Sequence, residues 1–209
     1  MIQMLLIAGA LLPGLAWAEG SPPIIVVLGD SLSAAYGIET KDGWVNLLGQ
    51  RLASAGLAHR VVNASVSGDT TGAGLTRLPQ ALERHRPDLV IIALGANDGL
   101  RGTPTRQIGD NLRRLVELTR GAGALPLLVG VRLPPNYGAA YNKAFQATLA
   151  EVAQTTGSPL IPDLLAGVAE DRDLMQADGL HPTAAAQARI LDTVWAGLSP
   201  LLGPLNATP

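Results

Sequence analysis

Short apolar runs alternate with longer segments of helical periodicity along most of the chain. The runs are rich in Val, Ile and Leu, which is typical of strands buried on both faces of a sheet. They predict strands over residues 24–28, 60–63, 89–94, 125–131 and 159–161. Apolar residues that recur every three or four positions predict helices around residues 44–52, 75–82, 108–118, 145–152 and 190–198. We predict that Pro182 opens the last helix, because proline is tolerated in the first helical turn.

Strands that alternate with helices pair in parallel, because each helix carries the chain back along the sheet. The predicted fold class is therefore α/β, a three-layer α/β/α arrangement around a five-stranded parallel sheet. The 209 residues fit one domain, and a hydrophobic content of 47% is enough for one continuous core. Ligands bind such sheets beyond the carboxyl ends of the strands, so the segments that follow the strands are where chemistry is expected.

The N-terminal segment has the pattern of an export signal. Residues 4–16 are almost wholly apolar and end at Ala16-Trp17-Ala18, a small-x-small sequence that a signal peptidase can cleave. We expect residues 1–18 to be a signal peptide and residues 19–209 to form a single domain in the periplasm or outside the cell. The run is too short for a membrane span, which takes ~20 apolar residues. No Lys or Arg precedes it, which is unusual for a signal peptide, and a buried N-terminal helix is the alternative.

Composition excludes several classes of function. The chain has 15 Lys and Arg against 17 Asp and Glu, without a long run of one sign, so no surface for nucleic acid or an anionic membrane is predicted. Aromatic residues, at 3%, are too few for base stacking. The absence of cysteine excludes disulfides, thiolate metal sites and a cysteine nucleophile.

Polar or glycine-containing segments follow each of the first three predicted strands. Gly29-Asp30-Ser31-Leu32 places the Ser31 hydroxyl at the rim of the sheet, and residues 63–70 contain Gly68, whose N–H a ligand can approach closely. Residues 95–99 aim the carboxamide of Asn97 at the same rim. Each has a simpler interpretation when taken alone: a helix cap, a turn glycine and an Asx turn.

A fourth segment, Asp178-Gly179-Leu180-His181-Pro182, is more specific. His181 can polarise a serine only if its second ring nitrogen has an acceptor, and Asp178 in the same short loop can supply it. The alternative is a surface histidine in a loop before a helix, a description that fits His59 and His85 better. The four segments meet at one rim of the predicted sheet and together supply a nucleophile, a base, an orienting acid and oxyanion donors.

In this order and setting, the four segments resemble those of the SGNH hydrolases, also called GDSL esterases. Further segments, such as residues 62–65, 99–102 and 133–138, resemble the branch of bacterial periplasmic thioesterase I, lysophospholipase L1 and arylesterase. One departure is Ala96, where that branch usually has glycine. The resemblance covers most of residues 24–202 and implies a flavodoxin-like SGNH fold.

The resemblance also implies a mechanism. Ser31 attacks an acyl carbonyl, His181 takes its proton and Asp178 orients the imidazole, while the N–H groups of Ser31 and Gly68 and the Asn97 side chain hold the oxyanion. It implies no metal and no cofactor, a small-molecule acyl ester or thioester as the substrate, no stable membrane insertion and a monomer. A carbohydrate O-acetyl esterase of the same family and a non-catalytic binding module stay open as alternatives.

Two other enzyme classes share some of these features. Asp30, Asp69, Asp98 and Asp178 follow predicted strands and could hold Mg²⁺ for phosphoryl transfer, but no Gly-Lys-Ser/Thr loop is present. A conventional α/β-hydrolase would need a Gly-x-Ser-x-Gly sequence, which the chain lacks. Candidate walls of an acyl groove are Leu100, Pro104 and residues 133–137, which follow the third and fourth predicted strands. Ordinary loop packing is the alternative for each of them.

Overall fold

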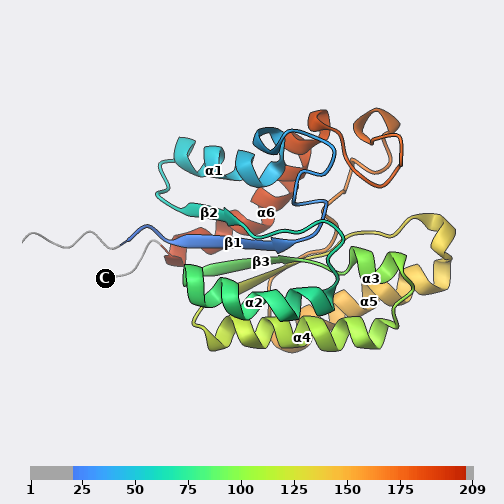
Figure 1. The fold of residues 1–209 in the computed structure, drawn as a ribbon, viewed down its shortest axis with the longest axis horizontal. Coiled ribbons are helices and arrows are strands. Elements are labelled where there is room, and N and C mark those ends of the chain that lie inside the picture. Colours follow the sequence, from blue (N-terminus) through green and yellow to red (C-terminus); the bar gives the residue numbers. More distant parts are fainter. Residues whose placement is uncertain (1–20, 206–209) are drawn as a thin grey trace, which may run out of the picture.

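A computed structural model describes residues 21–205 as three layers, with a parallel sheet between two layers of helices (Figure 1). The sheet has five strands in the order β2-β1-β3-β4-β5. This is the flavodoxin-like order, so the predicted fold class is confirmed. The predicted signal peptide, residues 1–18, lies outside the described part of the chain. The strands are β1 (Ile24–Gly29), β2 (Arg60–Asn63), β3 (Leu89–Ala93), β4 (Leu125–Val129) and β5 (Leu160–Ile161).

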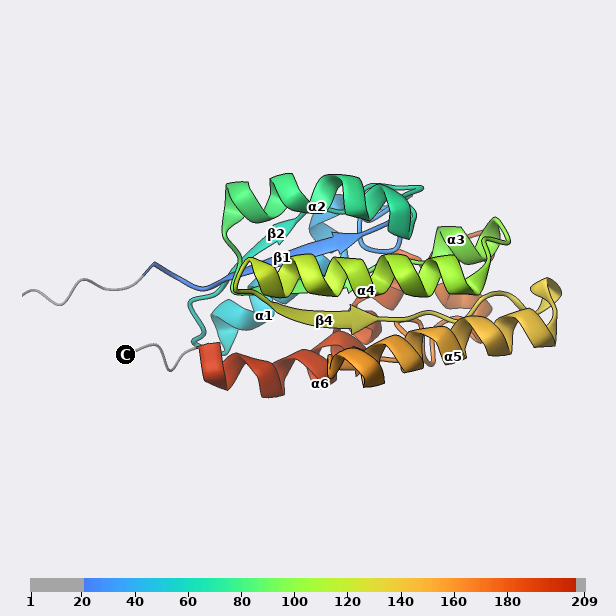
Figure 2. The same cartoon turned by 90° about the horizontal axis from the view of Figure 1, so that it is seen from below.

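Helices cover both faces of the sheet. One face carries α1 and α6, and the other carries α2, α4 and α5, as two perpendicular views show (Figures 1 and 2). The helices are α1 (Trp44–Ser54), α2 (Thr71–His85), α3 (Ala96–Leu100), α4 (Thr105–Gly121), α5 (Ala139–Thr156) and α6 (Gln187–Leu205). Single 3-10 turns lie at Thr40–Asp42, Pro135–Tyr137, Arg172–Leu174 and Ala184–Ala186. Within residues 21–205, no helix combines the length and apolar character needed to cross a membrane.

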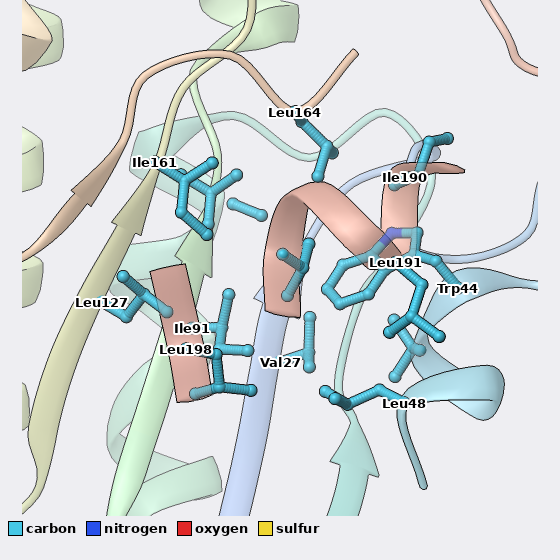
Figure 3. Close-up of a cluster of buried hydrophobic side chains, with 14 of the residues drawn as sticks. Val27, Trp44, Leu48, Ile91, Leu127, Ile161, Leu164, Ile190, Leu191 and Leu198 are labelled. Atoms are coloured by element: carbon cyan, nitrogen blue, oxygen red, sulfur yellow. The ribbon is translucent and has the colours of Figure 1, made fainter. Parts of the chain in front are cut away.

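The core is divided by the sheet into two apolar clusters. Successive strand side chains point to opposite faces, so Val27 and Ile91 pack under α1 and α6, whereas Val26 and Val90 pack against α2, α4 and α5. Trp44 is fully buried in the first cluster (Figure 3). Its indole Nε1 donates to the backbone oxygen of residue 32 at 3.1 Å, so the core directly supports the turn after β1.

The last helix begins later than the sequence predicts. Pro182 is buried and forms an antiparallel bridge with Met175, and the backbone N–H of Thr183 donates to the Leu174 oxygen at 2.8 Å. A 3-10 turn follows, and α6 starts at Gln187. The prediction that Pro182 opens the helix is therefore wrong, because its backbone is held in a loop that doubles back on residues 174–176.

The sequence predicts that His59 lies at the surface, but the structure buries it. Its exposed fraction is 7%, and neither ring nitrogen has a hydrogen-bond partner among the described residues. The pKa of His59 is lowered from 6.5, mainly because burial disfavours the charged ring, while the charge of Asp88 opposes this effect. His85 is half-buried and is the last residue of α2, so it does not lie in a loop before a helix.

Candidate active site

The four predicted segments gather at the carboxyl edge of the sheet. The chain leaves β1 toward β2 on one side and returns to β3 on the other, so β1 and β3 flank the point where strand order reverses. The segments after β1, β2 and β3 therefore lie beside one another. The connection from β5 to α6 brings the fourth segment, residues 178–182, to the same edge, as the contact between His181 and Ser31 shows.

Ser31 lies in a tight turn immediately after β1. The N–H groups of Ser33 and Ala34 donate to the Asp30 backbone oxygen at 3.1 and 2.9 Å. The N–H of Leu32 donates to Asp30 Oδ1 at 3.0 Å, so the turn is closed by backbone and side chain together. Helix α1 begins only at Trp44, so Ser31 is not the cap of that helix. The simpler interpretation of this serine is thereby removed.

Ser31, His181 and Asp178 form a hydrogen-bonded chain. His181 Nε2 lies 2.9 Å from Ser31 Oγ, and His181 Nδ1 lies 2.7 Å from Asp178 Oδ2. Asp178 Oδ1 also accepts the backbone N–H groups of Leu180 and His181, at 2.9 and 3.0 Å. The hydrogen bond from His181 and then these backbone bonds lower the pKa of Asp178 to about 2. The ionised carboxylate can thus hold the imidazole with Nε2 toward the serine.

Two further residues, absent from the sequence-based prediction, fix the histidine loop. The ring of Tyr36 lies against the His181 ring with centroids 4.4 Å apart. Gln176 donates its backbone N–H to the His181 oxygen at 2.7 Å, and its Nε2 donates to the oxygens of Tyr36 and Pro182 at 2.9 and 3.0 Å. Gln176 therefore ties the turn that carries Ser31 to the loop that carries His181. A single glutamine in an irregular loop gives no periodic signal that could have identified it.

Gly68 lies in the exposed loop between β2 and α2. Its φ of 86° is in the left-handed region that favours glycine, whereas a built Cβ would meet nothing closer than Arg101, at 4.0 Å. The backbone conformation, and not lack of space, therefore requires glycine there. Arg101 donates to the Gly68 oxygen at 3.0 Å. The N–H groups of Gly68 and Ser31 have no protein acceptor within residues 21–205.

Asn97 lies in the first turn of the short helix α3, which forms where the sequence predicts only a loop. Its side-chain nitrogen donates to the Asp69 backbone oxygen at 3.0 Å and to Asp30 Oδ2 at 3.3 Å. Both of its amide hydrogens thus have partners in this structure. An acyl oxyanion would have to replace one of them, and the longer bond, to Asp30, is the weaker of the two.

Three aspartates of the rim each bind a neighbouring segment. Asp98 accepts the backbone N–H and the hydroxyl of Thr71, both at 2.7 Å, and Asp69 pairs with Arg77. Asp30 is buried, and burial raises its pKa to about 6. Within the described residues, no group of three or more His, Asp or Glu side chains could hold a metal ion together.

A pocket of about 520 Å³ opens beside the serine. Ser31, Asn97 and His181 line it, whereas Gly68 and Asp178 do not. Of the predicted groove walls, Leu100 and residues 133–135 contribute, but Pro104, Asn136 and Tyr137 do not. The sequence-based prediction missed the walls on the β5 side, which are mostly irregular in backbone: Asp163, Leu165, Ala169, Glu170, Met175, Gly179 and Leu180.

The sequence profile described as the GDSL-like Lipase/Acylhydrolase family matches residues 27–189. The chain belongs to this family. The GDSL enzyme is accordingly a hydrolase of carboxylic ester or thioester bonds in acyl substrates, which agrees with the serine, histidine and aspartate at its rim. The predicted resemblance and the predicted enzyme class are both confirmed. Family membership also sets aside the non-catalytic binding module.

Named relatives cover nearly the whole GDSL enzyme. Esterase TesA of Pseudomonas aeruginosa is 47% identical over 96% of this chain and 100% of its own. Thioesterase 1/protease 1/lysophospholipase L1 of Escherichia coli is 40% identical over 90% of this chain and 89% of its own. The crystal structure of the psychrotrophic esterase EstA from Pseudoalteromonas, inhibited by monoethylphosphonate, superimposes with a TM-score of 0.83 at 39% identity, over 86% of this chain and 98% of that one.

Proposed function

We propose that the enzyme works through an acyl-enzyme formed on Ser31. The main support is the distance of 2.9 Å between Ser31 Oγ and His181 Nε2. On the other side of the ring, His181 Nδ1 lies 2.7 Å from Asp178 Oδ2. His181 takes the hydroxyl proton as Ser31 attacks the acyl carbonyl, and passes it to the leaving alcohol or thiol. Water then attacks the acyl-enzyme, with His181 again as the base. Asp178, whose pKa is about 2, stays ionised and stabilises the imidazolium.

Three donors are proposed to hold the oxyanion. The N–H groups of Ser31 and Gly68 have no protein acceptor among the described residues and are therefore available without rearrangement. The third donor is the Asn97 amide, which gives up its 3.3 Å bond to Asp30 when the oxyanion forms. Donors that are fixed before reaction lower the barrier because little reorganisation is needed.

The substrates are proposed to be acyl esters and thioesters with an extended apolar acyl group, of the arylesterase, thioesterase or lysophospholipase type. The names of the Pseudomonas and Escherichia relatives support this class. The pocket beside Ser31 also supports it, since Leu100, Leu133 and Leu165 are among its walls. An O-acetyl group would leave most of a pocket of about 520 Å³ unfilled, so a carbohydrate O-acetyl esterase is less favoured.

Export is proposed from the N-terminal sequence, with cleavage after Ala18 and action as a monomer in the periplasm or outside the cell. The apolar run that ends in Ala16-Trp17-Ala18 supports this proposal. N-terminal sequencing of the protein recovered from a periplasmic fraction should begin at Glu19. A product that retains Met1 and stays with the cytoplasm would contradict it, and light scattering of the cleaved protein tests the monomer.

A fluorophosphonate probe tests the acyl-enzyme proposal. We expect intact-mass analysis to show one adduct, peptide mapping to place it on Ser31, and Ser31→Ala to lose both the adduct and ester turnover. Ser33→Ala is a matched control, because Ser33 is in the same turn but its hydroxyl is buried and lacks a partner in the described structure. Continued labelling of Ser31→Ala, or an adduct on another residue, would disprove the proposal.

A further inference from the structure

The pocket beside Ser31 is apolar for most of its length but ends in charged side chains. Ser31 follows β1, whereas Arg132 follows β4 and Asp163 follows β5. The order β1-β3-β4-β5 places three strand spacings between the ends of β1 and β5, about 14 Å at ~4.8 Å per spacing. Arg132, after β4, is two spacings from β1, so the charged residues lie on the far side of the pocket from the serine.

These charges form one ion cluster, which consists of Arg132, Asp163 and Glu170. Arg132 Nε lies 3.1 Å from Asp163 Oδ2, and its NH1 lies 3.9 Å from Glu170 Oε1. Asp163 is held firmly, because its side chain is 10% exposed and its Oδ1 accepts the Leu165 N–H at 3.2 Å. Arg132 and Glu170 are both 63% exposed, so they are hydrated at the mouth of this end.

Such a cluster acts on an acyl chain differently from the apolar walls. Each methylene that is buried against leucine raises binding roughly fourfold, from the free energy of transferring a methylene out of water. A methylene that reaches the ion cluster gains little, because it must displace water that hydrates the exposed charged groups of Arg132 and Glu170. Favourable burial should therefore stop where the cluster begins.

We propose that the Arg132–Asp163–Glu170 cluster closes the distal end of the acyl site and makes the enzyme selective for acyl chains of short to medium length. The inference rests on the proposed function, in which the acyl group of a Ser31 ester occupies this pocket. An extended chain advances roughly 1.25 Å per carbon, so about 14 Å accommodates about eleven carbons. Longer chains must leave the pocket or separate the ion cluster.

An acyl-length series tests the proposal. We would measure kcat/KM for p-nitrophenyl esters from two to sixteen carbons with the wild type, Arg132→Met and Glu170→Leu. For the wild type we expect a maximum at or below about eleven carbons. For each variant we expect the maximum to move to longer chains, with the ratio of kcat/KM for fourteen over eight carbons raised by about tenfold. Glu170 is 63% exposed, so Glu170→Leu tests the proposal even if Arg132→Met folds poorly.

Matched controls separate charge from general surface effects. Arg114→Met and Glu117→Leu remove the same residue types from an exposed ion pair of 2.9 Å on α4, and neither residue lines the pocket. Their length profiles should match the wild type, as should that of Arg132→Lys, which keeps the charge. An unchanged profile in both Arg132→Met and Glu170→Leu would overturn the inference, as would an effect confined to the leaving group. Loss of Ser31 labelling by the fluorophosphonate in the wild type would overturn the proposed function and this inference with it.

Discussion

The side-chain amide of Asn97 donates a hydrogen bond to the buried carboxylate of Asp30 across 3.3 Å. This contact joins helix α3 to the turn that carries Ser31, and it is longer than the usual N–H···O distance of about 2.9 to 3.0 Å. The same nitrogen holds the Asp69 oxygen at 3.0 Å. The two bonds hold the amide at the rim, and the longer one is the bond that the proposed oxyanion would replace.

Asn97→Ala is expected to lower kcat by roughly 10²- to 10³-fold with a smaller change in KM, because an oxyanion donor acts mainly in the transition state. Steady-state kinetics with one short-chain ester measure the two constants. A thermal melt of the variant is needed beside them, since the substitution also removes the bonds to Asp30 and Asp69. A rise in KM with kcat unchanged would show that Asn97 only binds substrate.

Gln176→Met is expected to lower kcat about tenfold and to slow inactivation by the fluorophosphonate to a similar extent, because small errors in the position of a catalytic base are costly. Methionine retains the backbone N–H to His181 but loses both side-chain bonds, to Tyr36 and Pro182. Gln80→Met, on an exposed position of α2, is the matched control. A lower melting temperature with kcat and the inactivation rate intact would mean that Gln176 is merely structural.

The fold could be predicted from the sequence because its main signal is local. Five apolar runs and the periodic segments between them identify the strands and most helices, and parallel pairing follows from their alternation. The rim residues Ser31, Asn97 and His181 could be placed at one edge for the same reason, since each follows a strand or lies in one distinct loop. Alternation predicts that the strands are parallel and end at one edge, whereas the strand order that brings these residues together follows from the family resemblance.

What could not be predicted depends on side-chain contacts between segments distant in sequence. Gln176 contacts Tyr36 across 140 residues, and no local pattern indicates that pairing. Pro182 satisfies the local rule for a helix start, yet the bridge to Met175 prevails over it. His59 directly precedes a predicted strand and is charged at low pH, but packing buries it. The ion cluster of Arg132, Asp163 and Glu170 is likewise formed by segments that only the fold brings together.

Burial of Asp30 makes the fold less stable at high pH than at low pH. Its folded-state pKa of about 6 lies above its ordinary value of 3.8, chiefly because burial disfavours the charge. The native state therefore binds the proton more tightly than the unfolded state does. Burial of the ionised carboxylate lowers the free energy of unfolding by its full amount above pH 6, and this loss is relieved as the pH falls toward 3.8. At about 1.4 kcal/mol per pH unit, this cost is about 3 kcal/mol at neutral pH.

Asp30→Asn removes that titration. The free energy of unfolding of the variant minus that of the wild type should be about 2 kcal/mol more positive at pH 8 than at pH 4.5, so the variant is relatively more stable at pH 8. Urea unfolding of both proteins at the two pH values measures the difference. Any loss of the bonds to Leu32 and Asn97 affects both pH values, so it cancels in this comparison. A difference between variant and wild type that does not change with pH would show that burial of the Asp30 charge is not costly.

His59 changes the pH dependence of stability in the opposite direction, because the fold loses stability when this ring becomes protonated. Its pKa is lowered from 6.5, mainly by burial, so the folded state prefers the neutral ring. The stability that depends on neutral His59 is complete above pH 6.5 and is lost as the pH falls through the lower folded-state pKa. Because both ring nitrogens lack partners within the described structure, an apolar side chain leaves no hydrogen bond unmade.

His59→Leu is therefore expected to become more stable relative to the wild type as the pH is lowered from 7.5 to 5, by an amount that urea titrations at several pH values can measure. His59→Gln serves as the control for polarity, because it buries an amide but does not titrate. Both variants should show the same flattened pH dependence, displaced from each other by a constant cost for the buried amide. If the wild type and both variants lose stability in parallel across this range, protonation of His59 does not limit the acid stability of the fold.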